Sequence, residues 1–395
     1  MATAKRILLG ITGGIAAYKT PLLIRLLKKR GCEVKVVVTE NAKPLVGTEA
    51  LRTVSENPVY CDSSAHYDMN HIRLSQWADR FLICPATANS IAKIACGIGD
   101  NLLTSLCLSV AEEKIIIAPA MNTVMWSSKA TQANILTLKE RGVTVLPVGV
   151  GELACNKTGP GRMIEIEDVA HYVLSAQKAS DIFANKRILI SSGPTEEPVD
   201  PVRVITNRSS GKMGAAIARA AVLMGAEVVV VTGPASVKPP CGVTVREVKT
   251  ALEMKEALEE EFTSCDVCIM AAAVSDYRPL SYSDKKLHRK EDGKFSIDMR
   301  SNPDITAGLG KLKGNRLLVG FSLESGDNLK RAKEKMNKKN CDMMVYNRVD
   351  SSLGAESTKI TLLFSDGREE DHELMDKSDA AATILQSIAG SVTGL

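Results

Sequence analysis

Aromatic residues are scarce in this sequence, which has 6 Phe, 7 Tyr and 2 Trp among 395 residues. Its core must therefore be aliphatic, which favours buried parallel strands of Val, Ile and Leu beneath Ala-rich helices. An excess of one charge is also missing, because 50 Lys and Arg residues are balanced by 46 Asp and Glu residues and leave a formal net charge of +4. This balance argues against a large nucleic-acid-binding surface but leaves room for a local anion site.

Long hydrophobic runs are absent as well. No apolar segment reaches the roughly 20 residues that a membrane-spanning helix requires, and the first residues run into a strand pattern without the apolar core of a signal peptide. The ten cysteines are scattered along the chain, which predicts reduced thiols and a cytoplasmic location. The one CxxC motif, Cys265 and Cys268, lies in an apolar run. Strand alternation would place its thiols on opposite faces, so we interpret both as buried structural thiols and not as a metal or redox pair.

The sequence contains the same opening pattern twice. KRIL begins both copies, at residues 5 and 186, and each copy continues through a glycine-bearing turn and an Ala- and Leu-rich helix pattern to a second strand, EVKVVVT or EVVVVT. The length allows two or three domains at roughly 150 residues each. The repeated opening predicts an α/β protein of two doubly wound, Rossmann-like domains, at residues 1–178 and 186–395.

Continuous apolar runs are the expected parallel strands of both sheets. They are RILLGI, KVVVT, RFLICPA, KIIIAPA, RILISS, VVVVTG, VCIMAAA, RLLVGF and MMVYN. From KRIL to the second strand the chain takes 26 residues in the first copy and 39 in the second. The extra residues fall in SGPTEEPVDPVRVITNRSSGKMG, at the ligand-binding end of such a sheet. The polar stretch 281–305 predicts an excursion from the second sheet, such as a hairpin flap.

Several short motifs in the first half allow two interpretations. GITGGIAAYK follows the first strand and opens a helix, where glycines let a backbone approach a phosphate, but it is not the dinucleotide pattern GxGxxG. PATANSIAK is either an ordinary strand-to-helix turn with a helix cap or a second segment that lines the ligand site. His71, Asn122 and Cys155 stand at predicted strand ends or in loops, where such residues are more often functional than in a core.

Taken together, GITGGIAAYK, NHIRLSQWAD, PATANSIAKIACGIGDNL, PAMN and ACNKTGPGRM resemble the flavin-dependent cysteine decarboxylases that act on phosphopantothenoylcysteine. The resemblance implies that His71 acts as acid and base, Asn122 holds the substrate carboxylate, and Cys155 on a flap donates a proton in the final reduction. It also implies an FMN site at Gly13, Gly14, Ile15, Thr39, Ala86, Thr87, Ala88 and Asn89.

The second half contains candidate anion sites. TNRSSGKMG precedes a helix and has the composition of a phosphate-binding loop. A helix that is merely capped by serine would show the same sequence pattern, and the Walker A motif is absent. Lys335 and Lys339 are four residues apart on one helix face, which suits either a phosphate clamp or a solvated surface.

With AAAVSDYRP, NPDI and VGFSLE, these motifs resemble the phosphopantothenate–cysteine ligase domain over residues 186–370. The resemblance implies that the reaction uses CTP with Mg²⁺, whose ligands in the protein are unknown. It also implies that Asn207 acts on the acyl-cytidylate intermediate. Lys286 falls where the family pattern has a lysine, but Lys285 beside it makes the register uncertain by one. The implied CTP-binding residues are Ser210, Gly211, Lys212, Ala272, Ala273, Asp276, Lys286, Pro303, Asp304, Ile305, Thr306, Phe321, Lys335 and Lys339.

Both resemblances on one chain imply a bifunctional enzyme of coenzyme A biosynthesis, acting on small molecules, with neither nucleic acid nor membrane as partner. They imply homo-oligomers, with trimeric flavin domains, FMN between subunits, dimeric ligase domains and a dodecamer as one outcome. A flavin-binding regulatory protein of the same fold is the alternative. An NAD-dependent dehydrogenase is disfavoured, because GxGxxG is missing and Thr39 and Glu40 follow the second strand.

Overall fold

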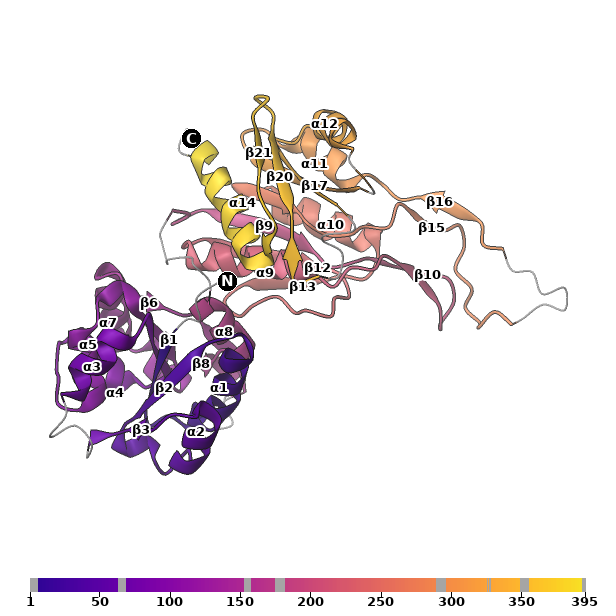
Figure 1. The fold of residues 1–395 in the computed structure, drawn as a ribbon. Coiled ribbons are helices and arrows are strands. Elements are labelled where there is room, and N and C mark those ends of the chain that lie inside the picture. The colour runs from indigo at the N-terminus through magenta and orange to yellow at the C-terminus, as the bar shows by residue number, and fades with distance from the viewer. Residues whose placement is uncertain are drawn as a thin grey trace. The chain divides into compact units, whose positions relative to one another are not determined.

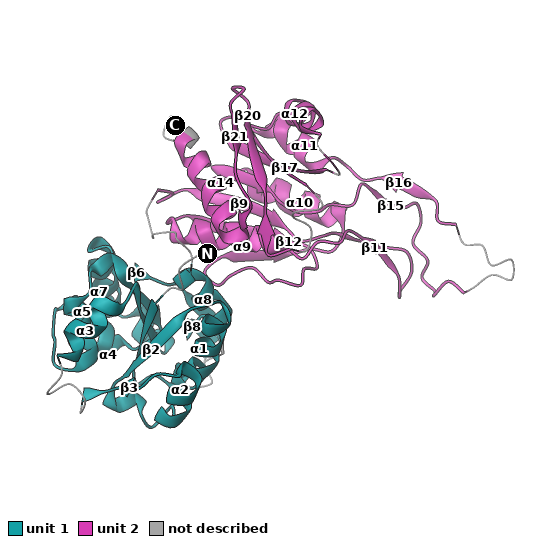
Figure 2. Cartoon of the chain, in the orientation of Figure 1, with its two compact units in different colours: residues 1–179 teal, residues 180–395 magenta. Residues whose placement is uncertain are grey.

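The computed structural model describes residues 6–62, 69–152, 158–174, 182–288, 296–324, 326, 328–348 and 355–392. The chain divides into two compact units, unit 1 over residues 1–179 and unit 2 over residues 180–395 (Figure 2). Each unit is built around a sheet whose central strands are parallel and which helices cover, so the predicted α/β, doubly wound class is confirmed.

Unit 1 contains a six-stranded, fully parallel sheet in the order β3-β2-β1-β4-β5-β6 (Figure 1). The chain runs outward in one direction from β1 and then in the other from β4, so the switch of direction lies between these two central strands. The strands are β1 (Arg6–Ile11), β2 (Glu33–Val38), β3 (Val59–Tyr60), β4 (Arg80–Ala86), β5 (Ile115–Pro119) and β6 (Thr144–Val145).

Helices cover both faces of this sheet, which explains why its strands are apolar throughout. One face packs against α3, α4, α5 and α7 through a single cluster that includes Leu8, Phe81 and Leu106. Helices α1, α2 and α8 pack beside one another, with α1 and α2 against β2. The helices are α1 (Thr20–Lys29), α2 (Thr48–Ser55), α3 (Asn70–Trp77), α4 (Ala88–Ala95), α5 (Leu102–Ser109), α6 (Thr123–Ser127), α7 (Lys129–Glu140) and α8 (Ile166–Leu174).

Unit 2 repeats this strand order and extends it. Its eight-stranded sheet has the order β13-β12-β9-β14-β17-β18-β20-β21, with the switch of direction between β9 and β14. The first six strands are parallel, whereas β20 and β21 are antiparallel. The strands are β9 (Arg187–Ser192), β12 (Glu227–Thr232), β13 (Thr244–Glu247), β14 (Val267–Met270), β17 (Leu317–Glu324), β18 (Met343–Arg348), β20 (Ile360–Phe364) and β21 (Glu369–Asp371).

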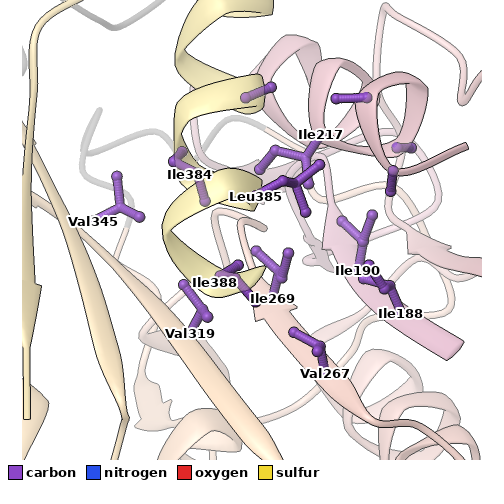
Figure 3. Packing of buried hydrophobic residues seen from close by; sticks show 14 of the residues in the cluster. Ile188, Ile190, Ile217, Val267, Ile269, Val319, Val345, Ile384, Leu385 and Ile388 are labelled. Carbon is purple, nitrogen blue, oxygen red and sulfur yellow. The ribbon is translucent and has the colours of Figure 1, made fainter. Parts of the chain in front are cut away.

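Two aliphatic clusters hold the helices of unit 2 on its sheet. On one face, Ile217 of α9 and Ile384 of α14 pack with Ile190 and Val319 of the strands (Figure 3). On the other face, α10, α11 and α12 contribute to a second cluster that includes Leu189 and Leu318. The helices are α9 (Lys212–Leu223), α10 (Ala251–Phe262), α11 (Ile305–Leu312), α12 (Leu329–Lys338) and α14 (Lys377–Val392).

Two short antiparallel pairs extend from the main sheet of unit 2 (Figure 1). The pair β10 (Glu196–Pro198) and β11 (Val204–Thr206) lies within the extra residues of the second opening. The pair β15 (Tyr277–Pro279) and β16 (Met299–Ser301) forms the base of the polar excursion, which is confirmed.

The structure corrects our placement of the CxxC thiols. Both are buried as expected, but they contribute to the same cluster and not to opposite faces. The reason is that β14 begins only at Val267, so Cys265 lies in the preceding turn, where strand alternation does not apply. Burial raises the pKa of the Cys265 thiol to about 11 and that of Cys268 well above its ordinary value, which suits inert structural thiols.

The antiparallel edge of unit 2 is a feature that we did not expect from the sequence. Its local signal is the Asp366–Gly367 dipeptide, with Gly367 at φ +91°, between β20 and β21. Asp-Gly between two short strands is a strong hairpin signal. Among the described residues, no helix is both long and apolar enough to cross a membrane.

Candidate functional site

The turns that follow β1 and β4 are tied together at the switch point of unit 1. The buried Thr12 hydroxyl donates to the Pro85 carbonyl oxygen at 2.8 Å and accepts from the Thr87 N–H at 3.0 Å. Ligands of doubly wound sheets bind at this edge, where the carboxyl ends of the two central strands diverge. Thr12 therefore fixes the spacing of the two predicted flavin-binding turns, a role that our sequence analysis missed.

A cavity of about 680 Å³ opens beside these turns. Its walls combine glycine backbone, a few polar groups and an apolar surface, which is typical of a site for a flat, partly polar ligand. The lining residues are Gly13, Gly14, Ile15, Ala16, Tyr18, Lys19, Thr87, Ala120, Met121, Asn122, Met125, Gly161, Arg162 and Met163.

Asn122 presents its amide to this cavity in a defined orientation. It is the N-cap of α6, and its Oδ1 accepts a hydrogen bond from the Met125 N–H at 2.8 Å. Because the amide oxygen is engaged in the helix cap, the Nδ2 group remains as a donor on the cavity wall. A carboxylate is a suitable acceptor for it.

A β-hairpin, β7 (Val148–Glu152) and β8 (Thr158–Met163), is attached at its base to the Asn122 segment. The Met121 N–H donates to the Gly161 carbonyl oxygen at 2.9 Å. Gly161 has φ +127°, and a Cβ atom there would lie 2.5 Å from the Met121 carbonyl oxygen. Only glycine permits this approach. Cys155, in the connection between the two strands, lies outside the described residues.

One copy of unit 1 does not bring all the predicted flavin-site residues to this cavity. Thr39 donates to the Ile11 carbonyl oxygen at 3.2 Å and so lies at the end of β1. His71 is half-buried on α3 and does not line the cavity. Ala86 at the end of β4, and Ala88 and Asn89 in the first turn of α4, do not line the cavity either.

Two cations on the cavity wall, Lys19 and Arg162, were not singled out in the sequence analysis, although both lie within motifs that were, GITGGIAAYK and ACNKTGPGRM. Lys19 Nζ lies 3.2 Å from Glu165 Oε2, and the Arg162 guanidinium lies 2.8 Å from Glu165 Oε1. One carboxylate therefore serves two cations, which leaves this wall with a net positive charge and suits an anionic ligand.

At the corresponding edge of unit 2, Asn207 joins the inserted segment to the turn after β14. Its Nδ2 group donates to the carbonyl oxygens of Ala273 and Val274, at 3.1 and 3.2 Å. The Ala272 N–H donates to Ser191 Oγ at the end of β9. The predicted residues Asn207, Ala272 and Ala273 thus meet where β9 and β14 diverge.

The N-terminus of α9 faces the same edge. Gly211 caps it with φ +77°, and a Cβ atom there would lie 2.7 Å from Ala235 Cβ. Lys212 begins the helix and pairs with Glu356 at 2.8 Å, while Ser210 accepts from the Val237 N–H through its carbonyl oxygen. A helix N-terminus with a glycine turn is a suitable anion site.

Asn302 connects two further motifs. Its N–H donates to the Asp276 carbonyl oxygen and its Nδ2 group to the Ser275 carbonyl oxygen, both at 2.8 Å. This places Asp276 beside Pro303 and Asp304, and Asp304 caps α11, whose first residues are Ile305 and Thr306.

Lys335 of α12 and Lys339, which caps the C-terminus of α12, have separate acidic partners. Lys335 Nζ lies 2.5 Å from the buried Glu324 carboxylate, and Lys339 Nζ lies 3.1 Å from Asp304. Burial would raise the pKa of the Glu324 carboxyl, but hydrogen bonds from Lys335 and Ser322 hold it below its ordinary value. Sequence spacing alone gave no indication of these pairs.

Two predicted residues lie elsewhere in unit 2. Phe321, in β17, is half-buried and packs against the cluster of Figure 3. Lys286 is exposed in the polar excursion. Among the described residues, no group of three or more His, Cys, Asp or Glu side chains could hold a metal ion.

Comparison with known proteins gives matches over both units. The family model "Flavoprotein" matches residues 1–178, and the model "DNA/pantothenate metabolism flavoprotein C-terminal domain" matches residues 183–392. The chain is 42% identical over 394 residues to the coenzyme A biosynthesis bifunctional protein CoaBC of Vibrio cholerae, covering 97% of each chain. It is 37% identical over 398 residues to CoaBC of Bacillus subtilis, covering 98% of each. It is also 43% identical over 350 residues to a cysteine/cysteine sulfinic acid decarboxylase of an unknown prokaryotic organism, covering 86% of this chain and 97% of that one.

Proposed function

Because the chain belongs to the CoaBC family of coenzyme A biosynthesis bifunctional proteins, we propose that unit 2 joins cysteine to phosphopantothenate and that unit 1 decarboxylates the phosphopantothenoylcysteine. The observation that supports this assignment is the presence of one motif-lined site in each unit, at the switch point of its sheet. Two sites on one chain suit two consecutive reactions.

The cavity of unit 1 fits FMN. Its volume of about 680 Å³ lies within the roughly 300–1,000 Å³ of small-molecule sites, and its glycine turn and apolar wall suit a phosphate and a flat ring. Bound FMN would supply a reversible hydride acceptor for the cysteinyl CH₂–SH group. The resulting C=S group would lie β to the carboxylate and would accept the electron pair released when CO₂ leaves.

The residues of unit 1 position the substrate and move its protons. Asn122 holds the carboxylate through the amide group that its helix cap leaves available. His71 acts as acid and base, and Cys155 donates a proton to carbon in the final reduction of the enethiol. Since His71 does not line the cavity of its own copy, we propose that a neighbouring copy supplies it in a homo-oligomer, with trimeric flavin units.

Unit 2 activates the phosphopantothenate carboxylate with CTP and Mg²⁺, because an amide forms slowly from a free carboxylate that lacks a leaving group. The α9 N-terminus with Ser210, Gly211 and Lys212 receives phosphate groups. Asn207 orders the site around the acyl-cytidylate. The other CTP-binding residues in this proposal are Ala272, Ala273, Asp276, Lys286, Pro303, Asp304, Ile305, Thr306, Phe321, Lys335 and Lys339.

A coupled assay tests this function. Purified protein incubated with CTP, Mg²⁺, cysteine and phosphopantothenate should release both pyrophosphate and CO₂ and should show flavin absorbance. Protein without flavin absorbance and without pyrophosphate release would refute the proposal. A second arm supplies cysteine alone, because one relative bears the name of a cysteine decarboxylase. CO₂ release from free cysteine at the same rate would assign unit 1 to that simpler substrate.

Gly161→Ala should reduce decarboxylation of supplied phosphopantothenoylcysteine by about 10- to 100-fold, because the added Cβ must displace the Asn122 segment and small displacements of positioning groups cost this much. CTP-dependent pyrophosphate release, which belongs to unit 2, should not change. Gly47→Ala is the matched control, since its Cβ would meet nothing within 4 Å. A wild-type decarboxylation rate in Gly161→Ala would show that the hairpin base does not position Asn122.

A further inference from the structure

Unit 2 contains a buried carboxylate, Asp200, that belongs to none of the candidate sites above. Its side chain is fully enclosed. It accepts hydrogen bonds from the N–H groups of Val202 and Arg203 in its own turn, both at 2.8 Å. It also accepts one from the Leu287 N–H at 3.0 Å, although Leu287 is 87 residues away in sequence.

Arg203 completes the link between the two segments. Its guanidinium donates to Asp200 Oδ2 at 2.9 Å and to the Leu287 carbonyl oxygen at 2.8 Å. Both backbone groups of Leu287 are therefore held by this pair. A second link lies four residues earlier, where the Ser283 N–H donates to the Val199 carbonyl oxygen at 3.1 Å.

These two links hold a segment that has no strand partner of its own. Residues 281–288 leave β15 as bends and irregular backbone. Among the described residues, these two links and the bond from the Ser283 hydroxyl to the Lys285 carbonyl oxygen fix the position of this segment. Lys285 and Lys286 lie between the two links, and both are exposed. A lysine on a loosely held backbone would lose additional conformational entropy on binding a phosphate, whereas one on a fixed backbone loses mainly its side-chain freedom.

Burying a carboxylate is costly unless its hydrogen bonds are made. Burial alone would raise the pKa of Asp200, but the N–H groups of Leu287, Val202 and Arg203 hold it below its ordinary value. The carboxylate is thus ionised and its acceptor positions are used. The Arg203 side chain is 44% exposed, so its ion pair with Asp200 contributes little net stability. We infer that the pair serves to fix one arrangement of the two segments.

We propose that Asp200 is a positioning residue of the ligase site, which holds the 283–287 segment so that Lys286 meets the phosphates of the nucleotide. This inference rests on the proposed function of unit 2. Asp200 touches no substrate in this scheme and acts only through the segment that it holds.

Asp200→Asn on the full-length enzyme tests the inference, since it keeps the size of the side chain but removes the charge and one acceptor. The KM for CTP should rise about tenfold with kcat within about threefold of wild type, because the loss is in the ordering of a binding group. Decarboxylation of supplied phosphopantothenoylcysteine should be unchanged.

A double-mutant cycle with Lys286→Gln separates positioning from general damage. If Asp200 acts through Lys286, Asp200→Asn should change the KM for CTP by less than about twofold when Lys286 is already Gln. Equal effects of Asp200→Asn in both backgrounds would overturn the inference, as would an unchanged KM in the single variant.

Limited trypsin digestion without nucleotide gives a readout that does not depend on activity. Asp200→Asn should speed cleavage after Lys285 and Lys286 by about fivefold or more, because local opening controls such cleavage, while the remaining fragments persist. Unchanged cleavage at these lysines, or digestion throughout unit 2, would overturn the positioning role. Wild-type enzyme without CTP-dependent pyrophosphate release would instead refute the proposed function.

Discussion

Cys155→Ser is expected to stop the reaction of unit 1 after decarboxylation, so that CO₂ is released while an enethiol accumulates in place of phosphopantetheine. Reduction of the enethiol requires a proton at carbon, and a thiol with a reference pKa of about 8.5 is a far better donor than an alcohol. Phosphopantetheine formation should fall by at least about 100-fold, the range of a lost general acid.

The hairpin geometry supports this role for Cys155. The strands β7 and β8 that flank residues 153–157 are bonded at their base to the Asn122 segment through Met121 and Gly161. Asn122, which we propose to hold the substrate carboxylate, and the hairpin strands that flank Cys155 therefore share one attachment point.

The experiment measures CO₂, enethiol absorbance and phosphopantetheine after addition of phosphopantothenoylcysteine. Cys96→Ser is the matched control, because Cys96 is exposed at the end of α4 and does not line the cavity. A normal phosphopantetheine yield from Cys155→Ser would remove Cys155 from its proposed role. Loss of CO₂ release as well would move its role to an earlier step.

Asn207→Asp should strongly reduce ligase activity while leaving decarboxylation intact. The amide nitrogen of Asn207 donates to two carbonyl oxygens, those of Ala273 and Val274. A carboxylate in its place would face both oxygens without a hydrogen to donate, so two attractive contacts would become repulsive. The inserted segment would then separate from the turn after β14, at the proposed acyl-cytidylate.

We expect amide formation from phosphopantothenate, cysteine and CTP to fall by about 100-fold or more, the usual loss when a site built for a charged intermediate is disrupted. Asn315→Asp adds the same charge at an exposed turn of unit 2 and should be neutral. Pyrophosphate and amide are measured separately, which locates the affected half-reaction. Amide formation within about threefold of wild type would contradict the role of Asn207.

The sequence was sufficient to predict the class of fold. Strands buried on both faces must be apolar throughout, so runs such as RFLICPA and VVVVTG indicated parallel sheets without further information. The repeated KRIL opening indicated that the pattern occurs twice. Local rules were less reliable at element ends, as Cys265 shows, because alternation holds only inside a strand.

Site residues were recognisable from the sequence only where a motif carries its own local chemistry. Gly13, Gly14 and Asn122 lie at strand-to-helix turns that such motifs mark, and all three line the cavity. For His71 and Thr39 the motif did not show where the side chain lies relative to the cavity, and neither residue lines the cavity of its own copy.

The sequence by itself therefore determined the two doubly wound sheets and the turns at which ligands would bind, because hydrophobic periodicity and turn chemistry act between near neighbours. Only the tertiary structure decided the pairings across long separations: Asn207 with Ala273, Lys335 with Glu324, and Asp200 with Leu287. Such contacts leave no local pattern. Whether a charge or an amide is catalytic, structural or merely solvated depends on the partner that the folded chain places beside it.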